Sequence, residues 1–297
     1  MVSAIHQLPD AQADALHRAY DSQIAARRSQ SFLGAAALVA LIFLAGYVGE
    51  VSIPKFLANI GNFSTYIGHL FYLDSGASVF SNVYEWFWGV TQKNKWLPLL
   101  GQTLLIAYIG TITGAVGAFI WCFLASQNLV QFKWLRIFSR RYLEFCRTVP
   151  ELVFALIFVV AFHLGPLPGI LALAIHTTGA LGKLFAEVVE NIDMKPVEGL
   201  TSTGATWVQM VRFAVVPQVL SNFVSYTLLR FEINVRSAGI MGFVGAGGIG
   251  QELLVSVRKF YYSDVSAILL LLIATVMIID LLTERARYAL IGREAQQ

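Results

Sequence analysis

Charged residues are scarce in this chain of 297 residues, and their scarcity excludes an ordinary soluble domain. Asp, Glu, Lys and Arg together make up 13% of the sequence, hydrophobic residues make up 57%, and the mean hydropathy is +0.65. Soluble domains carry about twice that share of charge. The composition therefore predicts a protein embedded in a lipid bilayer.

The chain also lacks the short motifs of several enzyme classes. It has no GxxxxGK[ST] phosphate loop and no HExxH, GxSxG or DxDxDG pattern. Its two cysteines, Cys122 and Cys146, lie 24 residues apart in or near apolar segments, without the spacing or the histidines of a metal site. We therefore expect no catalytic role and no cofactor or metal in this chain.

Basic residues do not gather in one patch. The net charge is +3, from 21 Lys and Arg against 18 Asp and Glu, and the cations lie beside hydrophobic segments. Nucleic acid is therefore not an expected partner, and the cations are expected to orient the chain in the membrane.

Hydropathy predicts an all-α integral membrane protein with about six transmembrane helices, since roughly 20 apolar residues cross the hydrocarbon core. The third and fourth spans are separated by Pro166 and Pro168, which indicate a short hairpin. The predicted spans are 31–48, 97–126, 152–165, 165–182, 213–229 and 265–282.

Residues 1–30 carry acidic and basic residues before any apolar run, which is too long and too acidic for a signal peptide. We interpret 1–30 as a cytoplasmic N-terminal arm and 31–50 as an uncleaved first transmembrane helix. Fourteen of the 21 cations fall on the side of the arm, and seven fall on the other side. The positive-inside rule therefore predicts that both termini and the loop around Glu198 are cytoplasmic.

Residues 51–96 are predicted to be an external amphipathic connection. Tyr84, Trp86, Phe87 and Trp88 lie close together there, and such rings favour the bilayer interface. A partial additional span is the alternative.

A polar loop, residues 195–217, separates the fourth and fifth spans. Its spacing of Glu198, Gly204 and Pro217 predicts two short helices joined at Gly204, with a membrane helix beginning at Pro217. Such a helix-turn-helix can dock on a soluble partner, and Glu198 can form a charge-assisted bond in the loop or with that partner. An ordinary solvated connection is the alternative.

Charged residues beside the apolar runs are the candidates for a pathway or a gate. Arg230, Glu232 and Arg236 are placed just beyond the fifth span, where a free guanidinium would attract an oxyanion; a structural Glu232–Arg236 ion pair is the favoured alternative.

Other polar residues occur near the third and fourth spans. Glu144, Arg147 and Glu151 suggest either an inner salt bridge or interfacial anchoring. His163, His176, Thr177 and Thr178 suggest either a polar pathway or hydrogen bonds between helices.

A glycine-rich run follows at 242–250 and contains GxGxxG at Gly245, Gly247 and Gly250. The strand and βαβ context of a dinucleotide site is absent from the sequence around it, so close backbone packing or a re-entrant turn is expected. Gly245, Gly247 and Gly248 are candidate pathway or gate residues, a role that the family resemblance given below implies.

Taken in order, these segments resemble the permease subunit of phosphonate-type ABC importers, and the 195–217 loop resembles the "EAA" coupling loop of ABC-importer permeases. The resemblance covers 147–250. The stretches that carry it are His176 to Gly179, Val197 to Leu200, Val216 to Gln218, Arg230 to Ser237 and the glycine run. Gly199 and Leu200 replace the two alanines of the general loop. The region before about Gln92 is not distinctive.

The resemblance implies a type I (MetI-like) ABC-importer permease core at 97–290, paired with a second copy in a bacterial inner membrane. It implies separate ATPase subunits that bind ATP and Mg, an external substrate-binding protein, and phosphonate, phosphite or a phosphate ester as the solute. The residues implied in coupling to the ATPase are Glu198, Gly199, Gly204, Ala205, Arg212 and Pro217.

Other functions stay open at this point. A permease for methionine or another small solute would share the loop and the glycine run. A channel or carrier that works without ATP would move solute when reconstituted alone. A membrane-embedded enzyme would need a catalytic cluster, and scattered His, Thr and Glu do not supply one.

Overall fold

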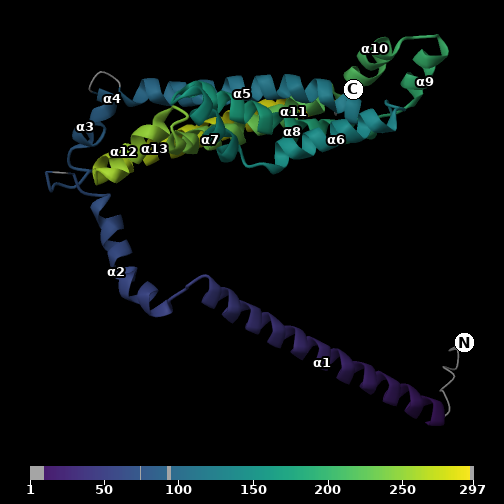
Figure 1. The fold of residues 1–297 in the computed structure, drawn as a ribbon, viewed down its shortest axis with the longest axis horizontal. Coiled ribbons are helices and arrows are strands. Elements are labelled where there is room, and N and C mark those ends of the chain that lie inside the picture. Colours follow the sequence, from purple (N-terminus) through teal and green to yellow (C-terminus); the bar gives the residue numbers. More distant parts are fainter. Residues whose placement is uncertain (1–9, 74, 92–94, 295–297) are drawn as a thin grey trace, which may run out of the picture. The chain divides into compact units, whose positions relative to one another are not determined.

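The computed structural model describes residues 10–73, 75–91 and 95–294, and within these ranges every regular element is helical (Figure 1). One isolated bridge, between Tyr72 and Ser78, is the sole extended pairing among the described residues. The chain divides into two compact units, Met1–Tyr66 and Ile67–Gln297, which are described separately.

The first unit consists of α1 (Asp10–Val48) and most of α2 (Ile53–His69). The part of α1 that can span a membrane is Arg27–Val48, which contains the predicted first span. Because helix continues from Asp10 without a break, the described part of the predicted N-terminal arm is helical rather than irregular. The first nine residues of that arm lie outside the described residues.

Up to six membrane spans are present in the described residues, which confirms the predicted all-α membrane architecture. Four are single helices, and two are pairs of helices bent at a short break. The single spans are Arg27–Val48, Trp96–Ala125 in α5, Pro166–Glu190 as α8 and Tyr262–Ala289 in α13 (Tyr262–Glu294).

The first bent pair combines α6 (Lys133–Thr148) with α7 (Glu151–Phe162) at an angle of 85°. Pro150 explains the bend, because proline excludes the helical conformation from the residue before it. Val149 accordingly has an extended backbone, with φ −73° and ψ 122°. The predicted third span is therefore only the second half of a bent span, whose first half, α6, was not predicted.

The second bent pair contains the largest difference from the sequence prediction. It covers Trp207–Val244 and Ile249–Arg258, bent by 48°, and its main helix is α11 (Val216–Met241). The fifth span was predicted to end at Leu229, but α11 continues for three further turns. Arg230, Glu232 and Arg236 thus lie within this membrane helix, and their placement beyond it was wrong.

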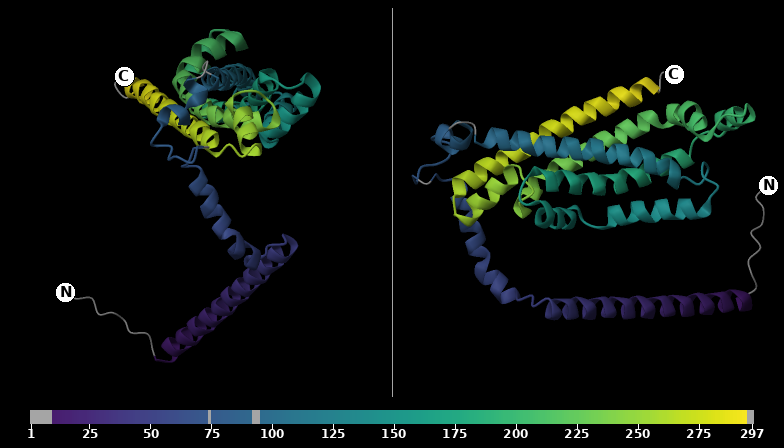
Figure 2. Two further views of the ribbon diagram at one scale, coloured as in Figure 1. Left: turned by 90° about the vertical axis from the view of Figure 1, so that its left-hand side faces the viewer. Right: turned by 45° about the horizontal axis from the view of Figure 1, so that its top comes forward.

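Close packing of α5 on α8 forms the centre of the second unit, and the two helices lie alongside each other in Figures 1 and 2. A Cβ atom added at Gly110 would lie 2.7 Å from Leu173 Cβ, and one added at Gly114 would lie 2.6 Å from Thr177 Cβ. Small residues drive helix association in a bilayer because they bring the two backbones within van der Waals contact.

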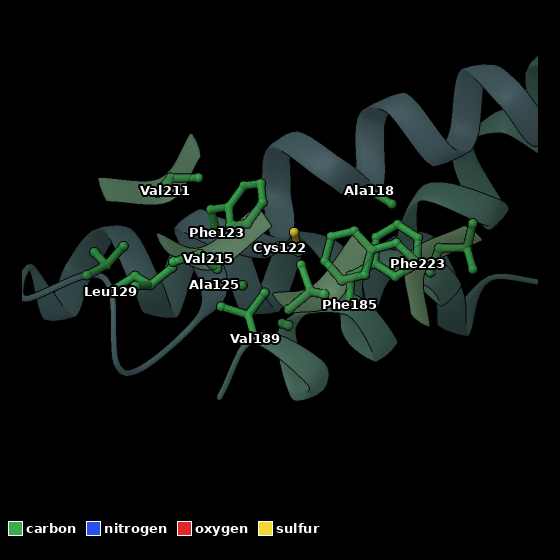
Figure 3. Close-up of a cluster of buried hydrophobic side chains, with 14 of the residues drawn as sticks. Ala118, Cys122, Phe123, Ala125, Leu129, Phe185, Val189, Val211, Val215 and Phe223 are labelled. Atoms are coloured by element: carbon green, nitrogen blue, oxygen red, sulfur yellow. The ribbon is translucent and has the colours of Figure 1, made fainter. Parts of the chain in front are cut away.

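A buried cluster fills the loop-side half of these helices (Figure 3). The rings of Phe185 on α8 and Phe223 on α11 stack face to face, with centroids 3.9 Å apart and planes 10° apart. Cys122 is fully buried beside them, which agrees with a packing role. Such contacts stabilise the bundle through dispersion, since lipid tails are as apolar as the side chains themselves.

The described residues between 67 and 96 fold onto the opposite end of the second unit. Two short helices occur there, α3 (Val83–Trp86) and α4 (Trp88–Thr91). The indole of Trp86 donates to Ser266 Oγ at 2.8 Å, and the indole of Trp88 donates to Asp264. Trp96 is fully buried between α12 (Ile249–Arg258) and α13. The aromatic residues of this segment therefore pack on the core as well as facing outward.

Candidate functional site

The 195–217 loop forms a helix-turn-helix that extends beyond the ends of the neighbouring helices (Figures 1 and 2). It contains α9 (Lys195–Ser202) and α10 (Trp207–Met210). The first turn of α9 begins where Asp193 Oδ1 accepts a hydrogen bond from the backbone N–H of Lys195 at 3.0 Å. Pro196 follows in the first helical turn, where a missing N–H costs nothing.

Gly204 ends α9 by a specific backbone arrangement. Its φ of +78° lies in the left-handed region, which glycine adopts without steric cost. The N–H of Gly204 donates to Thr201 O at 3.0 Å, and the N–H of Ala205 donates to Leu200 O at 3.3 Å. This pair of bonds is a Schellman motif, which satisfies the last carbonyls of α9 and fixes the direction in which the chain leaves.

Thr206 then starts α10. Its backbone N–H and its hydroxyl both donate to Gln209 Oε1, at 2.8 and 3.0 Å. The stop at Gly204 and the start at Thr206 are only two residues apart, so a short turn joins α9 and α10, and the backbone N–H groups from Thr203 to Thr206 all donate hydrogen bonds.

A π-helical turn, Val211–Val215, connects α10 to α11. The N–H of Val216 donates to Val211 O, five residues back. Pro217 follows in the first turn of α11 and has no N–H to donate. The wider turn thus occurs where the regular pattern of hydrogen bonds is interrupted by proline.

The helix-turn-helix is attached to the bundle at two places. Gln218 on α11 bonds the backbone of Asp193, and the indole of Trp207 donates to Leu129 O at 3.2 Å. Val197 on α9 is 4% exposed and packs in the same cluster as Leu129. Movement of the loop would therefore be transmitted to α11 and to the end of α5.

Most of the predicted coupling residues are exposed. Glu198, Gly199, Gly204, Arg212 and Pro217 are exposed, and Ala205 is half-buried. The carboxylate of Glu198 makes no hydrogen bond or ion pair within the part of the chain that the structure describes. It also lines a groove of about 800 Å³ between α9, α10 and residues 128–135.

An ionic network fixes the loop-side ends of three helices. Arg140 on α6 forms an ion pair with Glu190 on α8, and its Nε donates to Ala125 O at 2.9 Å at the end of α5. Glu190 Oε1 also accepts from the backbone N–H of Gln127 at 2.7 Å. The ends of α5, α6 and α8 next to the loop are therefore linked to one another.

A second group of predicted residues meets deeper in the bundle. Arg230 on α11 donates from Nη2 to His176 Nδ1 on α8 at 2.5 Å and from Nε to Thr177 Oγ1 at 3.4 Å. His176 Nδ1 lies 3.6 Å from Glu151 Oε2 on α7. Arg230, His176, Thr177 and Glu151, which are separated in the sequence, therefore form one cluster, which we call the central polar cluster.

Buried hydrogen bonds complete this cluster. The amide of Asn234 donates to Thr111 Oγ1 at 2.8 Å and to Thr177 Oγ1 at 2.9 Å, which joins α5, α8 and α11. Ser237 Oγ donates to Glu151 Oε1 at 2.8 Å. The sequence prediction missed Thr111, Asn234 and Ser237, because neutral polar residues inside a span give no hydropathy signal.

Arg236 belongs to a separate group. It forms ion pairs with Glu232 on α11 and with Asp280 on α13, the latter at 3.4 Å. This geometry agrees with the structural ion pair and extends it to a second helix. Arg147 is exposed at the end of α6 and makes no ion pair among the described residues, while Glu144 pairs with Arg141. The structure therefore does not join Glu144, Arg147 and Glu151 in an inner salt bridge.

The glycine run forms a tight turn between α11 and α12. Gly245, Gly247 and Gly248 all have φ between +81° and +83°. Gly245 O accepts from the N–H of Gly165 in the α7–α8 loop at 3.0 Å, and the N–H of Gly248 donates to Gln102 Oε1 at 3.1 Å. No β-strand precedes the turn in the described residues, so its surroundings are those of helix packing and not of a dinucleotide site.

Comparison with known proteins decides the family. Residues 122–295 match the family model described as binding-protein-dependent transport system inner membrane component. The chain belongs to this family. It is therefore a transmembrane permease subunit of a transport system, as the segments of the sequence predicted.

Curated relatives agree with this assignment. The chain is 41% identical to the phosphite transport system permease protein PtxC of Stutzerimonas stutzeri over 186 residues, which cover 63% of this chain and 68% of PtxC. It is 31% identical to the putative phosphite transport system permease protein HtxC of the same organism over 271 residues, 91% of each chain.

Solved structures show the same fold at lower identity. A methionine ABC transporter structure, MetNI, matches with a TM-score of 0.56 and 19% identity over 65% of this chain and 95% of that chain. A bacterial ABC transporter involved in the import of alginate matches with a TM-score of 0.58 and 13% identity over 85% of this chain and 99% of that chain. These likenesses confirm the MetI-like permease fold.

Proposed function

We propose that this permease subunit forms the translocation pathway of an ATP-driven importer for phosphonate, phosphite or a related phosphorus oxyanion. PtxC and HtxC, named above, are phosphite transport permeases. The chain is also 37% identical over 190 residues to the phosphate-import permease protein PhnE of Mycolicibacterium smegmatis, covering 64% of this chain and 36% of PhnE. The solutes in these names share a phosphorus centre with anionic oxygens.

The anchored helix-turn-helix is the observation that carries the coupling part of the proposal. Its exposed residues, Glu198 and Arg212, are available to a soluble partner, while Gln218 and Trp207 connect it to the bundle. A partner ATPase that displaces α9 would therefore displace α11, which carries Arg230 and Asn234.

We infer the following assembly. Two permease chains pair in a bacterial inner membrane with both termini in the cytoplasm, each α9–α10 element contacts one ATPase subunit, and an external binding protein delivers the solute. ATP and Mg are bound by the ATPase subunits. Closure of the ATPases on ATP draws the two loops together and opens the pathway outward, and hydrolysis resets it.

Gly204→Pro tests the coupling role. Proline fixes φ near −65° and removes the N–H that donates to Thr201, so the turn between α9 and α10 cannot form. We expect normal membrane insertion, retained basal ATP hydrolysis in the assembled transporter, and solute uptake reduced about tenfold or more, the loss expected when about 1.4 kcal/mol of coupling is removed.

Gly199→Ala is the matched control. Gly199 is exposed within α9, and an added Cβ there has nothing within 4 Å. Alanine stands at this position in the general coupling loop that the segment resembles, so uptake should be unchanged in this variant. If Gly204→Pro kept solute-stimulated ATPase activity and uptake at the level of Gly199→Ala, the coupling role of the loop would be wrong.

The solute class is tested separately in proteoliposomes that contain the complete transporter. We expect ATP-dependent uptake of phosphite or methylphosphonate and none of methionine. Uptake of methionine alone would favour the methionine-type alternative, and uptake by the permease without ATPase or ATP would favour a channel or carrier.

A further inference from the structure

Arg230 is a cation near the middle of a membrane span, and no carboxylate of the described residues lies within ion-pair distance of it. It lies 14 residues after Val216 and 11 residues before Met241, the two ends of α11. Its guanidinium makes no ion pair within 4.0 Å among the described residues. Charged side chains at this depth are normally paired or face a water-filled cavity, because lipid does not solvate them.

The contrast with Arg236, on the same helix, is direct. Arg236 has two carboxylate partners, Glu232 and Asp280, so its charge is already neutralised. Arg230 instead contacts a histidine nitrogen and a threonine hydroxyl. Because arginine keeps its proton and donates, His176 Nδ1 accepts, and the imidazole is neutral with its proton on Nε2.

Hydrogen-bond donors remain unused at Arg230. A guanidinium has five N–H groups, and the two bonds to His176 and Thr177 use one from Nη2 and the one from Nε. The other three have no partner in the part of the chain that the structure describes. The cluster is also open at the protomer surface, since the side chains of Glu151 and His176 are 27% and 14% exposed.

We propose that Arg230 is a transient binding site for the oxyanion of the solute, with Glu151 as the group that limits its affinity. This inference rests on the proposed function and names a solute contact within the pathway. The planar donors of Arg230 match two oxygens of a phosphonate or phosphite. Asn234 holds Thr177, and Thr177 and His176 hold the guanidinium, so these residues position Arg230.

Glu151 explains why such a site would release its ligand. Ser237 holds this carboxylate within the central polar cluster, beside His176 but beyond ion-pair distance of Arg230. A bound oxyanion therefore meets a fixed negative charge nearby, which weakens its binding. A pathway residue must bind the solute weakly enough to let it leave.

The test measures binding of methylphosphonate to the permease–ATPase complex in a maltoside detergent, without the binding protein and without phospholipid. Broadening of the ³¹P resonance reports exchange with the complex. We expect broadening with the unaltered complex, its loss in Arg230→Gln, with affinity lowered about tenfold or more, and partial retention in Arg230→Lys, which keeps the charge but not the planar donors.

Two further variants sharpen the result. Glu151→Gln should tighten binding by a factor of about ten, because it removes the neighbouring negative charge. Arg141→Gln is the matched control, since it removes one exposed cation of α6 that already pairs with Glu144, and binding should be unchanged. If the Arg230→Gln complex does not assemble, the reduced broadening expected with Arg230→Lys tests the same contact.

Persistent broadening in Arg230→Gln, or weaker binding in Glu151→Gln, would overturn the inference, as would absence of broadening with the unaltered complex. Displacement of methylphosphonate by added phosphatidylglycerol would assign the site to an anionic lipid headgroup and would also overturn the inference.

Uptake by the complete unaltered transporter distinguishes failure of the proposed function from failure of this inference. If no phosphorus oxyanion is taken up, the proposed function fails; if uptake occurs and the binding results are negative, only this inference fails.

Discussion

Gln218 forms two hydrogen bonds with the backbone of Asp193. The N–H of Asp193 donates to Gln218 Oε1 at 3.1 Å, and Gln218 Nε2 donates to Asp193 O at 3.2 Å. The same Nε2 donates to Ala214 O at 2.7 Å. One side chain in the first turns of α11 thus fixes the segment that leads into α9.

Gln218→Ala should weaken the link between the loop and α11. The substitution removes both bonds to Asp193, which are exposed to solvent, at a cost of about 0.5–1.5 kcal/mol per bond. We expect basal ATPase activity to persist while uptake falls severalfold, measured together in proteoliposomes. Asn222→Ala is the control, because Asn222 lines a surface pocket together with Asp193 and Gln218 and makes no hydrogen bond in the described residues. Equal uptake by the two variants would refute the link.

Gly114→Ala should destabilise the bundle. The new methyl group would lie 2.6 Å from Thr177 Cβ and 2.8 Å from Ala174 O, so α5 and α8 must separate. Overpacking of this kind costs about 1–3 kcal/mol. Thermal unfolding in detergent measures it, with Gly101→Ala as the control on the same helix, where nothing lies within 4 Å of the added atom. A stability loss no greater than that of the control would contradict the close packing.

Asn234 and Thr111 should be energetically coupled. Their hydrogen bond is fully buried between α5 and α11. Hydrogen bonds between membrane helices contribute about 0.6 kcal/mol on average and up to about 1.7 kcal/mol. A double-mutant cycle with Asn234→Ala and Thr111→Val, measured by unfolding in detergent, should give a coupling energy in this range. Strictly additive effects would show that the bond contributes nothing to stability.

Cysteine labelling of intact cells tests the orientation. Cys122 and Cys146 are 0% and 1% exposed, so a membrane-impermeant maleimide should react with neither. Tyr84→Cys, at a position 69% exposed, should be labelled from outside. Ser202→Cys, on the exposed part of α9, should be labelled only after the membrane is permeabilised. The reverse pattern would invert the topology.

Much of the fold follows from the sequence because bilayer thickness sets the length of an apolar run. The run from Leu97 to Ser126 predicts α5 to within a residue at each end. In the loop, Gly204 marks the end of α9, because glycine adopts a positive φ without steric cost. Pro217 marks the first turn of α11, because proline has no N–H to donate and fits where none is needed.

The central polar cluster could not be predicted in the same way. A hydropathy average ends the span at Arg230, because its side chain is charged. The helix continues in the structure because residues from distant parts of the chain form hydrogen bonds or ion pairs with Arg230 and Arg236. His176 precedes Arg230 by 54 residues, and Asp280 follows Arg236 by 44. The Gly110-x-x-x-Gly114 spacing is a local signal of the α5–α8 contact, and it is readable from the sequence alone.

The glycine contacts between α5 and α8 also restrict where the subunit can bend. Gly110 and Gly114 leave no room for one helix to slide along the other, because Leu173 and Thr177 would meet the backbone of the next turn. We therefore expect α5 and α8 to move as a single rigid body. Within the described membrane spans, hinge motion would then be confined to the breaks of the two bent pairs, at Val149–Pro150 and at Gly242–Gly248.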